Sequence, residues 1–372
     1  MGYSIALSAD GSVMAVGGPY DSGNIGAVWI YTFSQGSGWT EQTKIVPTDE
    51  GGNSDDNFGV SVALSSDGNT LAVAGPNYTG DGSGGVWIYS HSNNQWTEQT
   101  KIIPDNVVGT NADLAYTAIS VDGNTLVIGG RTDNAGVGAV WIYTRSGSSW
   151  TQQTKIIPTD ELNGPSNFGG AVSINADATT LAVGGSSDNG DIGATWIYTY
   201  SPQTSTWREE AKIIPSDVGK TPGFGWVVAL SADGNTLVAS GAEDTIDTTP
   251  LGAFWIYTRT GGIWVEQLKV VQPTSNQLGA ALAISADGSK LVVGAPFAGA
   301  YNTVTNTNPG EVWVYSLSSN SCSSGTQITV SDDYNHEGAT FGSAVALSSN
   351  GSVMAAGGAV DNNHAGAAWV FH

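Results

Sequence analysis

A Trp-Ile-Tyr triplet and its close variants recur along the whole chain, and this repeat limits the fold more than any other feature. The copies begin at seven tryptophans, namely Trp29, Trp87, Trp141, Trp196, Trp255, Trp313 and Trp369. Successive copies lie 54 to 59 residues apart. A period above about 50 residues is too long for most helical solenoids and is typical of a four-stranded propeller blade. The sequence therefore predicts an all-β, seven-bladed β-propeller.

Residues 58–103 show one complete predicted unit, with strands at 58–64, 70–74, 85–89 and 96–103. The Asp67-Gly68 turn between the first two strands supplies the positive φ that a short hairpin needs. The first strand is built from small residues, which suits the central channel, and the polar fourth strand suits an exposed outer edge. We expect one domain over 1–372, with units at about 1–57, 58–113, 114–167, 168–223, 224–277, 278–340 and 341–372.

Twelve of the thirteen tryptophans follow this register. Seven lie in the third strands and five open the fourth strands, where large rings fill the wedge between adjacent blades. We interpret these rings as core residues, although a row of sugar-stacking platforms is the alternative. Trp226 falls outside the pattern, because it directly follows Phe224-Gly225 at a position where other units carry different residues. It is therefore a candidate ligand contact.

The Phe-Gly pairs, together with the glycine-rich end of the second strand, resemble the FG-GAP repeat of integrin-α-like seven-bladed propellers. The matching segments are Phe58-Gly59, Ala74-Gly75-Pro76, Phe168-Gly169, Phe224-Gly225, Phe341-Gly342 and Gly294-Ala295-Pro296. The calcium-binding repeats of that family carry a long Asp-rich loop between the first two strands. Here that connection is a bare turn such as Asp67-Gly68, which cannot supply six to eight oxygen ligands. We expect no metal site and no cofactor.

An aspartate recurs in the loop from the second to the third strand of five units, at Asp21, Asp133, Asp188, Asp244 and Asp361. These carboxylates could line one rim and bind cations or polar ligands. The alternative is that each accepts backbone N–H bonds within its own loop. The sixth unit has the longest such loop, which contains Tyr301 as a further candidate ligand contact.

The charge balance excludes several kinds of partner. With 33 acidic and 11 basic residues, the formal net charge is −22, which is poorly suited to nucleic acid or to an anionic membrane. No apolar run approaches 18 residues, so no membrane insertion is expected. Cys322 is the one cysteine, which excludes an internal disulfide. The polar, lysine-poor composition favours an extracellular protein or one on a cell or virion surface, with a protein or a glycan as its partner.

The seventh unit ends at its third strand, so its fourth strand is missing from the pattern. We expect an open, apolar edge formed by Ala367, Ala368, Trp369, Val370 and Phe371. Another chain could add a strand there, and a homo-oligomer is one such assembly. The alternatives are a domain trimmed from a longer protein, or an edge that is simply tolerated.

Catalysis finds little support in the sequence, because the four histidines are scattered and show no triad or metal spacing. We expect a non-enzymatic propeller that serves recognition or structural assembly. The alternative is a lectin-like, glycan-binding module that uses the rim loops and Trp226. A carboxylate-dependent hydrolase or lyase is the third interpretation.

Overall fold

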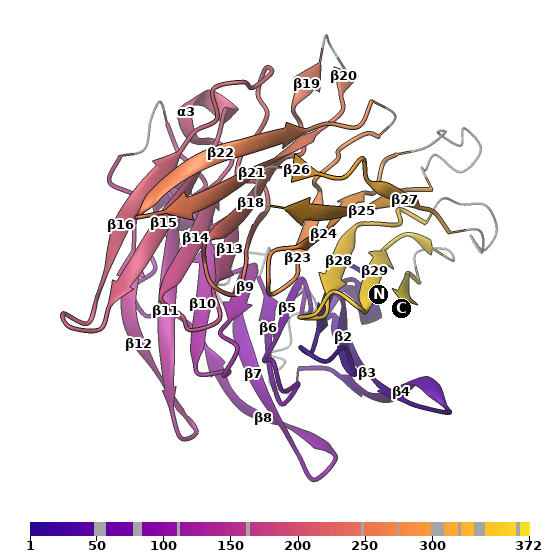
Figure 1. Ribbon diagram of the computed structural model, residues 1–372. Helices are drawn as coiled ribbons and strands as arrows, with labels where there is room; N and C mark the ends of the chain where they lie inside the picture. The colour runs from indigo at the N-terminus through magenta and orange to yellow at the C-terminus, as the bar shows by residue number, and fades with distance from the viewer. Residues whose placement is uncertain are drawn as a thin grey trace.

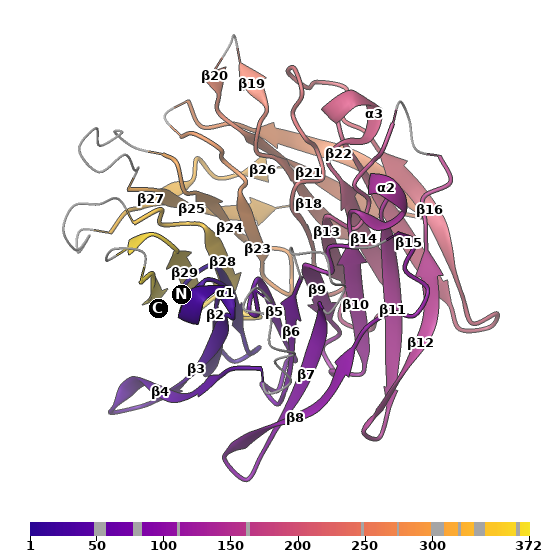
Figure 2. The same cartoon turned by 180° about the vertical axis from the view of Figure 1, so that it is seen from behind.

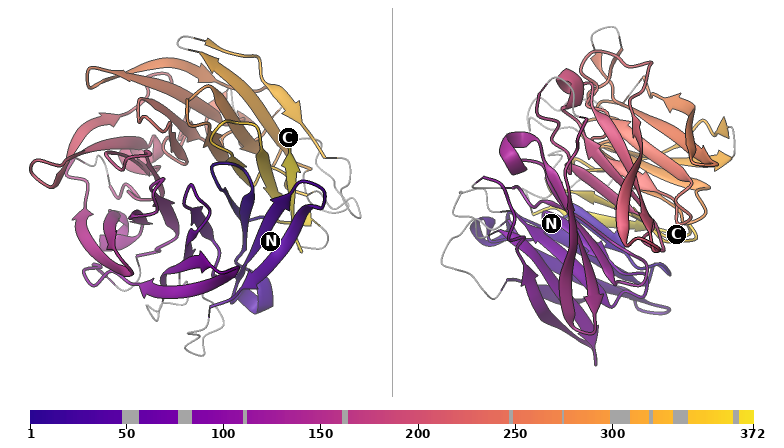
Figure 3. Two further views of the ribbon diagram at one scale, coloured as in Figure 1. Left: turned by 60° about the horizontal axis from the view of Figure 1, so that its bottom comes forward. Right: turned by 90° about the vertical axis from the view of Figure 1, so that its left-hand side faces the viewer.

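Seven small antiparallel β-sheets surround a central axis in the computed structural model (Figure 1, Figure 2). The structure describes residues 1–47, 57–76, 84–109, 112–160, 164–246, 249–273, 275–298, 309–318, 321–330, 339–361 and 365–372. Each sheet is one blade, and the view along the ring shows the blades following one another in chain order (Figure 3). The predicted all-β, seven-bladed propeller is confirmed.

Blades one to four each contain four strands in sequence order. Blade one comprises β1 (Ser4–Leu7), β2 (Val13–Gly18), β3 (Ala27–Ser34) and β4 (Gly38–Ile45). Blade two comprises β5 (Ser61–Leu64), β6 (Thr70–Gly75), β7 (Gly85–Ser92) and β8 (Gln95–Ile102). Blade three comprises β9 (Tyr116–Ile119), β10 (Thr125–Gly130), β11 (Ala139–Ser146) and β12 (Ser149–Ile156). Blade four comprises β13 (Ala171–Ile174), β14 (Thr180–Gly185), β15 (Ala194–Ser201) and β16 (Thr206–Ile213).

The last three blades depart from this plan. Blade five comprises β17 (Val228–Leu230), β18 (Thr236–Gly241), β21 (Ala253–Thr260) and β22 (Ile263–Val270), with a small hairpin of β19 (Thr245–Ile246) and β20 (Thr249–Pro250). Blade six comprises β23 (Ala281–Ile284), β24 (Lys290–Ala295) and β25 (Glu311–Ser318), and the short β26 (Ser321–Cys322) and β27 (Thr326–Ile328) both pair with β25. Blade seven comprises β28 (Ala344–Leu347), β29 (Met354–Gly358) and β30 (Ala367–Phe371). As predicted, the described residues give this blade no outer strand.

Three helical turns of four residues lie between the second and third strands of their blades. They are α1 (Asp21–Asn24), α2 (Asp133–Gly136) and α3 (Asp188–Asp191), and each begins at one of the recurring aspartates. None of the helices in the described residues is long and apolar enough to cross a membrane.

The turn between the first two strands is closed by its own side chains. Asp67 accepts hydrogen bonds from the Asn69 amide at 3.0 Å and from the Ser65 hydroxyl at 2.6 Å, and Gly68 has a φ of 69°. The Ser65 hydroxyl oxygen also accepts a bond from the Thr70 amide at 2.9 Å. The aspartate oxygens are thus occupied inside the turn, as is usual for Asp in short turns.

These turns also link neighbouring blades around the axis. The Ala9 amide donates to the Ser66 carbonyl, the Ala232 amide to the Ala286 carbonyl and the Ala286 amide to the Ser349 carbonyl, each at 2.9 Å. The ring is closed by the same kind of bond, because the Ser349 amide in blade seven donates to Ala9 in blade one at 2.9 Å. At the opposite face, the Met1 ammonium donates to the Ala365 carbonyl at 2.6 Å. The propeller therefore closes through blade-to-blade bonds at both faces.

The core lies between the blades and is organised around the Trp-Ile-Tyr triplets. Trp87, Trp141, Trp196 and Trp255 are completely buried. The phenylalanine of the Phe-Gly pair meets the triplet tryptophan of its own blade edge to face, for example Phe168 and Trp196 at 5.2 Å between ring centroids. Such pairs contribute about 0.5–1.5 kcal/mol beyond their area burial. These tryptophans are core residues, as we expected, and not sugar platforms.

Candidate ligand-binding pocket

A pocket of about 760 Å³ opens at the axis, on the face where the first strand of each blade begins and the second strand ends. The first strands of neighbouring blades contact one another around the whole ring, so they form its innermost layer. We call this the axial pocket, and its volume lies in the range of small-molecule sites. It is lined by Tyr3, Tyr20, Tyr116, Arg131, Gly170, Ser186, Trp226, Val227, Gln277, Ala280, Pro296, Phe297, Thr340, Ser343, Ala359 and Val360.

The aromatic rings of the axial pocket come largely from one repeated position, the residue that follows the Phe-Gly pair. We call it the rim position, and from blade one to blade seven it holds Tyr3, Val60, Tyr116, Gly170, Trp226, Ala280 and Ser343. The small residues among these leave space at the axis, and the three aromatic ones line it. Residues at the rim position therefore determine both the size of the pocket, where they are small, and part of its wall, where they are aromatic.

Trp226 has 44% of its surface exposed, whereas Trp255 in the same blade has none. Because a core tryptophan is buried by its neighbours, this exposure separates Trp226 from the packing set. Phe297, which lies two residues after the second strand of blade six, is also 44% exposed in the pocket. Two large apolar rings therefore meet solvent inside the pocket, where a ligand face could cover them.

Arg131 is the one charged residue among the described residues that line the axial pocket. Its Nε donates to the buried Asp113 carboxylate at 2.6 Å, and its Nη1 donates to the Tyr116 hydroxyl at 3.1 Å. The Arg131 side chain is 36% exposed, whereas that of Asp113 is 4% exposed. Asp113 therefore fixes the guanidinium from below, and the exposed part of the cation gives the pocket a positive group.

Tyr3 and Tyr116 are neutral hydrogen-bond donors at physiological pH, because the pKa of each phenol is raised. Burial raises the pKa of Tyr3 to about 12, and the ring of Tyr20 meets that of Tyr3 edge to face at 5.8 Å. Burial also raises the pKa of Tyr116, although the Arg131 charge opposes this shift. A ligand in this pocket would meet phenol donors, a guanidinium and exposed aromatic faces.

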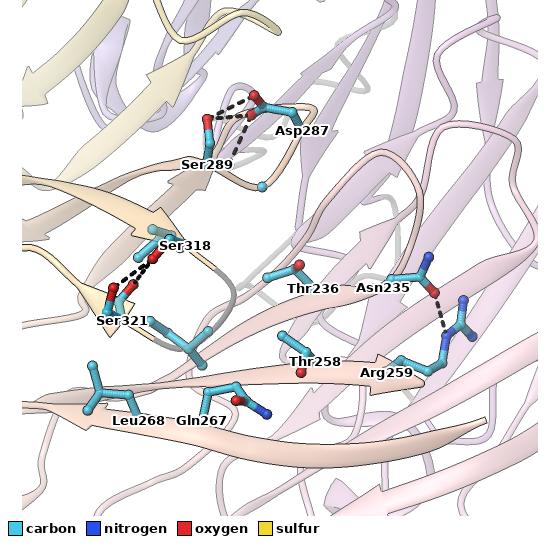
Figure 4. Close-up of a pocket in the computed structure, with 13 residues that line it drawn as sticks. Asn235, Thr236, Thr258, Arg259, Gln267, Leu268, Asp287, Ser289, Ser318 and Ser321 are labelled. Atoms are coloured by element: carbon cyan, nitrogen blue, oxygen red, sulfur yellow. Dashed lines mark hydrogen bonds between the residues drawn. The ribbon is translucent and has the colours of Figure 1, made fainter. Parts of the chain in front are cut away.

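A second, smaller pocket of about 300 Å³ lies on the opposite face between blades five and six (Figure 4). Arg259 lines it, and its guanidinium donates to Asn235 at 3.0 Å and to Glu210 at 3.0 Å. Asp287 also lines it, but this carboxylate accepts hydrogen bonds from the Ser289 amide and from the Ser289 hydroxyl, which are drawn in Figure 4. Since the polar groups of this pocket are engaged with one another, the axial pocket is the better candidate.

The structure does not place the recurring aspartates on a ligand-binding rim. Four of them form ion pairs with the lysine of the fourth strand in their own blade. The pairs are Asp21–Lys44 at 2.7 Å, Asp133–Lys155 at 2.7 Å, Asp188–Lys212 at 3.0 Å and Asp244–Lys269 at 2.8 Å. Asp361 lies at the same position in blade seven and is 7% exposed. The hypothesis of an open ring of five carboxylates is wrong, because in four of the blades a lysine from the outer strand neutralises the aspartate inside the blade.

The other site predictions have different outcomes. Trp226 lies in the axial pocket, whereas Tyr301 lies outside the described residues. Sequence reasoning missed Arg131, Tyr3 and Tyr116. The last two occupy the rim position with Trp226, so aligning the seven units at their Phe-Gly pairs could have found them.

A family model described as the FG-GAP repeat matches residues 39–89 and 207–257. Each matched stretch runs from the tryptophan of one fourth strand to the tyrosine of the next triplet. The chain is a seven-bladed β-propeller that contains FG-GAP repeats. This confirms the resemblance inferred from the Phe-Gly pairs.

No curated protein matched the FG-GAP propeller in sequence. Among solved structures, it resembles a proposed 6-phosphogluconolactonase from Bacteroides uniformis with a TM-score of 0.59 and 10% identity, covering 93% of this chain and 88% of that one. It also resembles the periplasmic gluconolactonase PpgL of Pseudomonas aeruginosa with a TM-score of 0.58 and 16% identity, covering 97% of this chain and 95% of that one. At these identities the likeness shows the fold alone.

These neighbours correct one expectation. We expected a non-enzymatic protein because the histidines are scattered and show no triad spacing. Yet propellers with the same overall fold are named as lactonases, so the absence of such spacing gave no ground for excluding catalysis.

Proposed function

We propose that the FG-GAP propeller binds an anionic, carbohydrate-like small molecule, such as a sugar acid, in the axial pocket. The observation that carries this proposal is the exposed indole of Trp226 in a pocket of about 760 Å³ at the axis. An exposed aromatic face can cover the C–H face of a sugar ring, and such contacts need one large flat side chain held by a rigid scaffold.

Arg131 supports the choice of an anionic ligand. The FG-GAP propeller carries a net charge of −22, so an anion meets general repulsion and needs a local cation. The guanidinium supplies that cation in a planar geometry that suits a carboxylate or a phosphate. The phenols of Tyr3 and Tyr116 add donors for hydroxyl or carboxylate oxygens.

A second candidate is hydrolysis of a sugar lactone in the same pocket, favoured by the names of the two structural neighbours. Arg131 and the Tyr116 hydroxyl could bind the lactone carbonyl oxygen and stabilise the charge that develops there. We do not propose a mechanism in which two carboxylates act as acid and base, because the described lining residues include no Asp or Glu. In this candidate, water attack depends on electrostatic stabilisation of the carbonyl.

The test measures binding of gluconate, 6-phosphogluconate and neutral glucose by isothermal titration calorimetry. We expect anions to bind more tightly than glucose, and W226A to weaken binding about tenfold or more. The matched control is I263A, because Ile263 is 66% exposed in the same blade but lies outside the pocket. Equal affinities for W226A and the unchanged protein would refute the proposed site.

The role of charge is tested with the double variant D113N/R131Q, which removes the cation without leaving the buried Asp113 carboxylate unpaired. We expect it to lose the preference for anions and to keep the binding of neutral sugars. The lactonase candidate is tested separately by following acid release from glucono-δ-lactone in a pH-stat. Binding without acid release would reject hydrolysis and retain the binding function.

Location outside the cytoplasm or on a surface is part of this proposal. It is supported by the low share of charged residues, 12%, and by the Gly-rich composition.

A further inference from the structure

A fourth-strand tryptophan packs into the outer part of several seams, where a seam is the space between two adjacent blades. At four seams this ring packs against a buried cluster that contains the triplet isoleucine of the preceding blade. The residues that share a cluster in this way are Trp96 with Ile30, Trp150 with Ile88, Trp207 with Ile142, and Trp264 with Ile197. An indole ring is thus the usual occupant of this part of a seam.

At two of these seams the indole N–H also has an acceptor on the preceding blade. Trp96 donates to the Gln42 side chain at 3.2 Å, and Trp207 donates to the Gln153 side chain at 3.1 Å. Both glutamines occupy the same position of a fourth strand, three residues after its tryptophan. A buried indole N–H usually finds such a partner, so the seam offers the ring both apolar contact and a hydrogen bond.

The seam between blades five and six has different side chains at these positions. Leu317 pairs with Cys322 in blade six, as Arg259 pairs with Trp264 in blade five. Arg259 donates to Thr180 across its own seam at 3.2 Å. An arginine and a tryptophan are therefore replaced in blade six by a leucine and a cysteine. These smaller side chains pack against the cluster between blades five and six, but they fill less of the outer seam.

The pocket of about 300 Å³ between blades five and six lies at this seam, and we call it the seam pocket (Figure 4). Ile256, Gln267 and Leu268 of blade five line it, with Leu317 of blade six opposite. Ile256 retains 6% exposure, whereas the four triplet isoleucines that share a cluster with a tryptophan have none. The seam pocket is thus open where the other seams hold an indole.

The blade-five wall of the seam pocket offers an acceptor and an apolar surface. Gln267 occupies the position of Gln42 and Gln153, which accept an indole N–H. Its Nε2 donates to the Val265 carbonyl at 3.1 Å, so the amide oxygen remains as the acceptor. Leu268 is 37% exposed and stands where blades one to four have threonine or alanine. A flat apolar ring could cover this side chain.

The charges around the seam pocket favour a neutral or cationic ligand over an anionic one. Asp287 lines the pocket and brings a carboxylate to it. Arg259 lines it too, but Glu210 neutralises this guanidinium at 3.0 Å. The protein as a whole carries a net charge of −22, which repels anions.

We propose that the seam pocket binds a small molecule with a fused aromatic ring and a ring N–H, such as an indole or a cationic indole amine. The ring would lie between Ile256, Leu268 and Leu317, and its N–H would donate to the Gln267 amide oxygen. The volume of about 300 Å³ lies at the lower end of the range for small-molecule sites, which suits one such ring with a short substituent. This site is separate from the axial pocket and does not depend on the function proposed there.

The probe is fluoroindole, with the fluorine on the benzene ring, and its binding to the complete 372-residue chain is followed by fluorine NMR. We expect a saturable change in the fluorine signal. The N-methylated analogue lacks the N–H and should bind about three- to tenfold more weakly, which is the effect of one hydrogen bond. Fluorotryptamine should bind more tightly than fluoroindole acetate, because the acetate is anionic. These comparisons leave the protein unchanged, so misfolding cannot explain them.

The variant Q267L should lower the affinity for fluoroindole to that for the N-methylated analogue. The matched control is Q99L in blade two. Gln99 donates to the Thr97 carbonyl at 3.3 Å, as Gln267 does to Val265, but its seam already holds Trp150. Q99L should therefore leave fluoroindole binding unchanged, and so should W226A, which alters only the axial pocket.

The variant C322W should place an indole in the seam pocket and abolish fluoroindole binding. Q267L and the ligand comparison keep the test independent of whether C322W folds. Three results would overturn the proposal: no saturable binding, equal affinities for fluoroindole and its N-methylated analogue, or full affinity in Q267L. Self-association of the protein that closes the seam pocket, seen by sedimentation, would also overturn it.

Discussion

The ion pairs between a fourth-strand lysine and a recurring aspartate make a quantitative prediction, because two of them differ strongly in burial. Lys155–Asp133 and Lys44–Asp21 both have an N–O distance of 2.7 Å, and both ammonium groups lie 4.9 Å from an indole. The side chains of the first pair are 9% and 0% exposed, whereas those of the second are 37% and 25% exposed. The cation–π contribution therefore cancels between them. The main remaining difference is burial, to which the Lys155 bond to the Asn106 carbonyl at 2.8 Å is added.

We expect K155M to lower the free energy of unfolding by about 3–5 kcal/mol, because it leaves the Asp133 carboxylate buried without its counterion. K44M should cost only about 0–1 kcal/mol, because water can solvate Asp21. Urea denaturation followed by tryptophan fluorescence measures both, after coincident transitions by a second probe have established two-state behaviour. The double variant D133N/K155M should recover much of the loss. Equal losses for K155M and K44M would refute the reasoning from burial.

Two further predictions concern titration. Hydrogen bonds from Ser285 and Ser289 lower the pKa of Asp287 to about 2, so its contribution to stability is present above its ordinary pKa near 3.8 and is lost as the pH falls toward 2. D287N should still fold, since Asn350 accepts the equivalent Ser352 amide bond in blade seven at 2.9 Å. The difference in the free energy of unfolding between D287N and the unchanged protein should vanish near pH 2. A difference that does not depend on pH would contradict this. Burial raises the pKa of the Cys322 thiol to about 11 from its ordinary value of 9. At pH 8, Ellman's reagent should therefore react about a hundredfold more slowly with the folded protein than with the urea-unfolded protein. Equal rates would show an exposed thiol.

Much of the fold could be predicted because each blade repeats the same sequence pattern of strands and turns. In blade two, the predicted second strand at 70–74 matches β6 (Thr70–Gly75) to within one residue. The first strand was predicted to begin at 58, but β5 begins at Ser61. The difference arises at Gly59, where a φ of 94° turns the chain while Phe58 pairs with Gly26 of the preceding blade. That pairing depends on the neighbouring blade, which local sequence does not describe.

The candidate site was harder to predict, because its chemistry depends on contacts between distant parts of a blade. The recurring aspartates and lysines are both visible in the sequence, yet Asp133 and Lys155 are 22 residues apart and meet only when the outer strand folds back. Arg131 is a single residue without a counterpart in other blades. Its role follows from the Asp113 contact at 2.6 Å, which no spacing rule predicts.

The bond between Ser349 and Ala9 has a mechanical consequence for the ring. The other six junctions are crossed by the polypeptide itself, whereas the described residues join blades seven and one by hydrogen bonds at the inner turns and by packing of Ala355 against Met14 and Val16. The seam is fastened near the axis and at the Met1 ammonium, and toward its periphery Phe33 contacts His372 at 5.3 Å between ring centroids. Heat or a pulling force should separate blades seven and one before any other pair of blades, starting at the periphery of the seam. The six remaining junctions would then hold the blades together as an open arc.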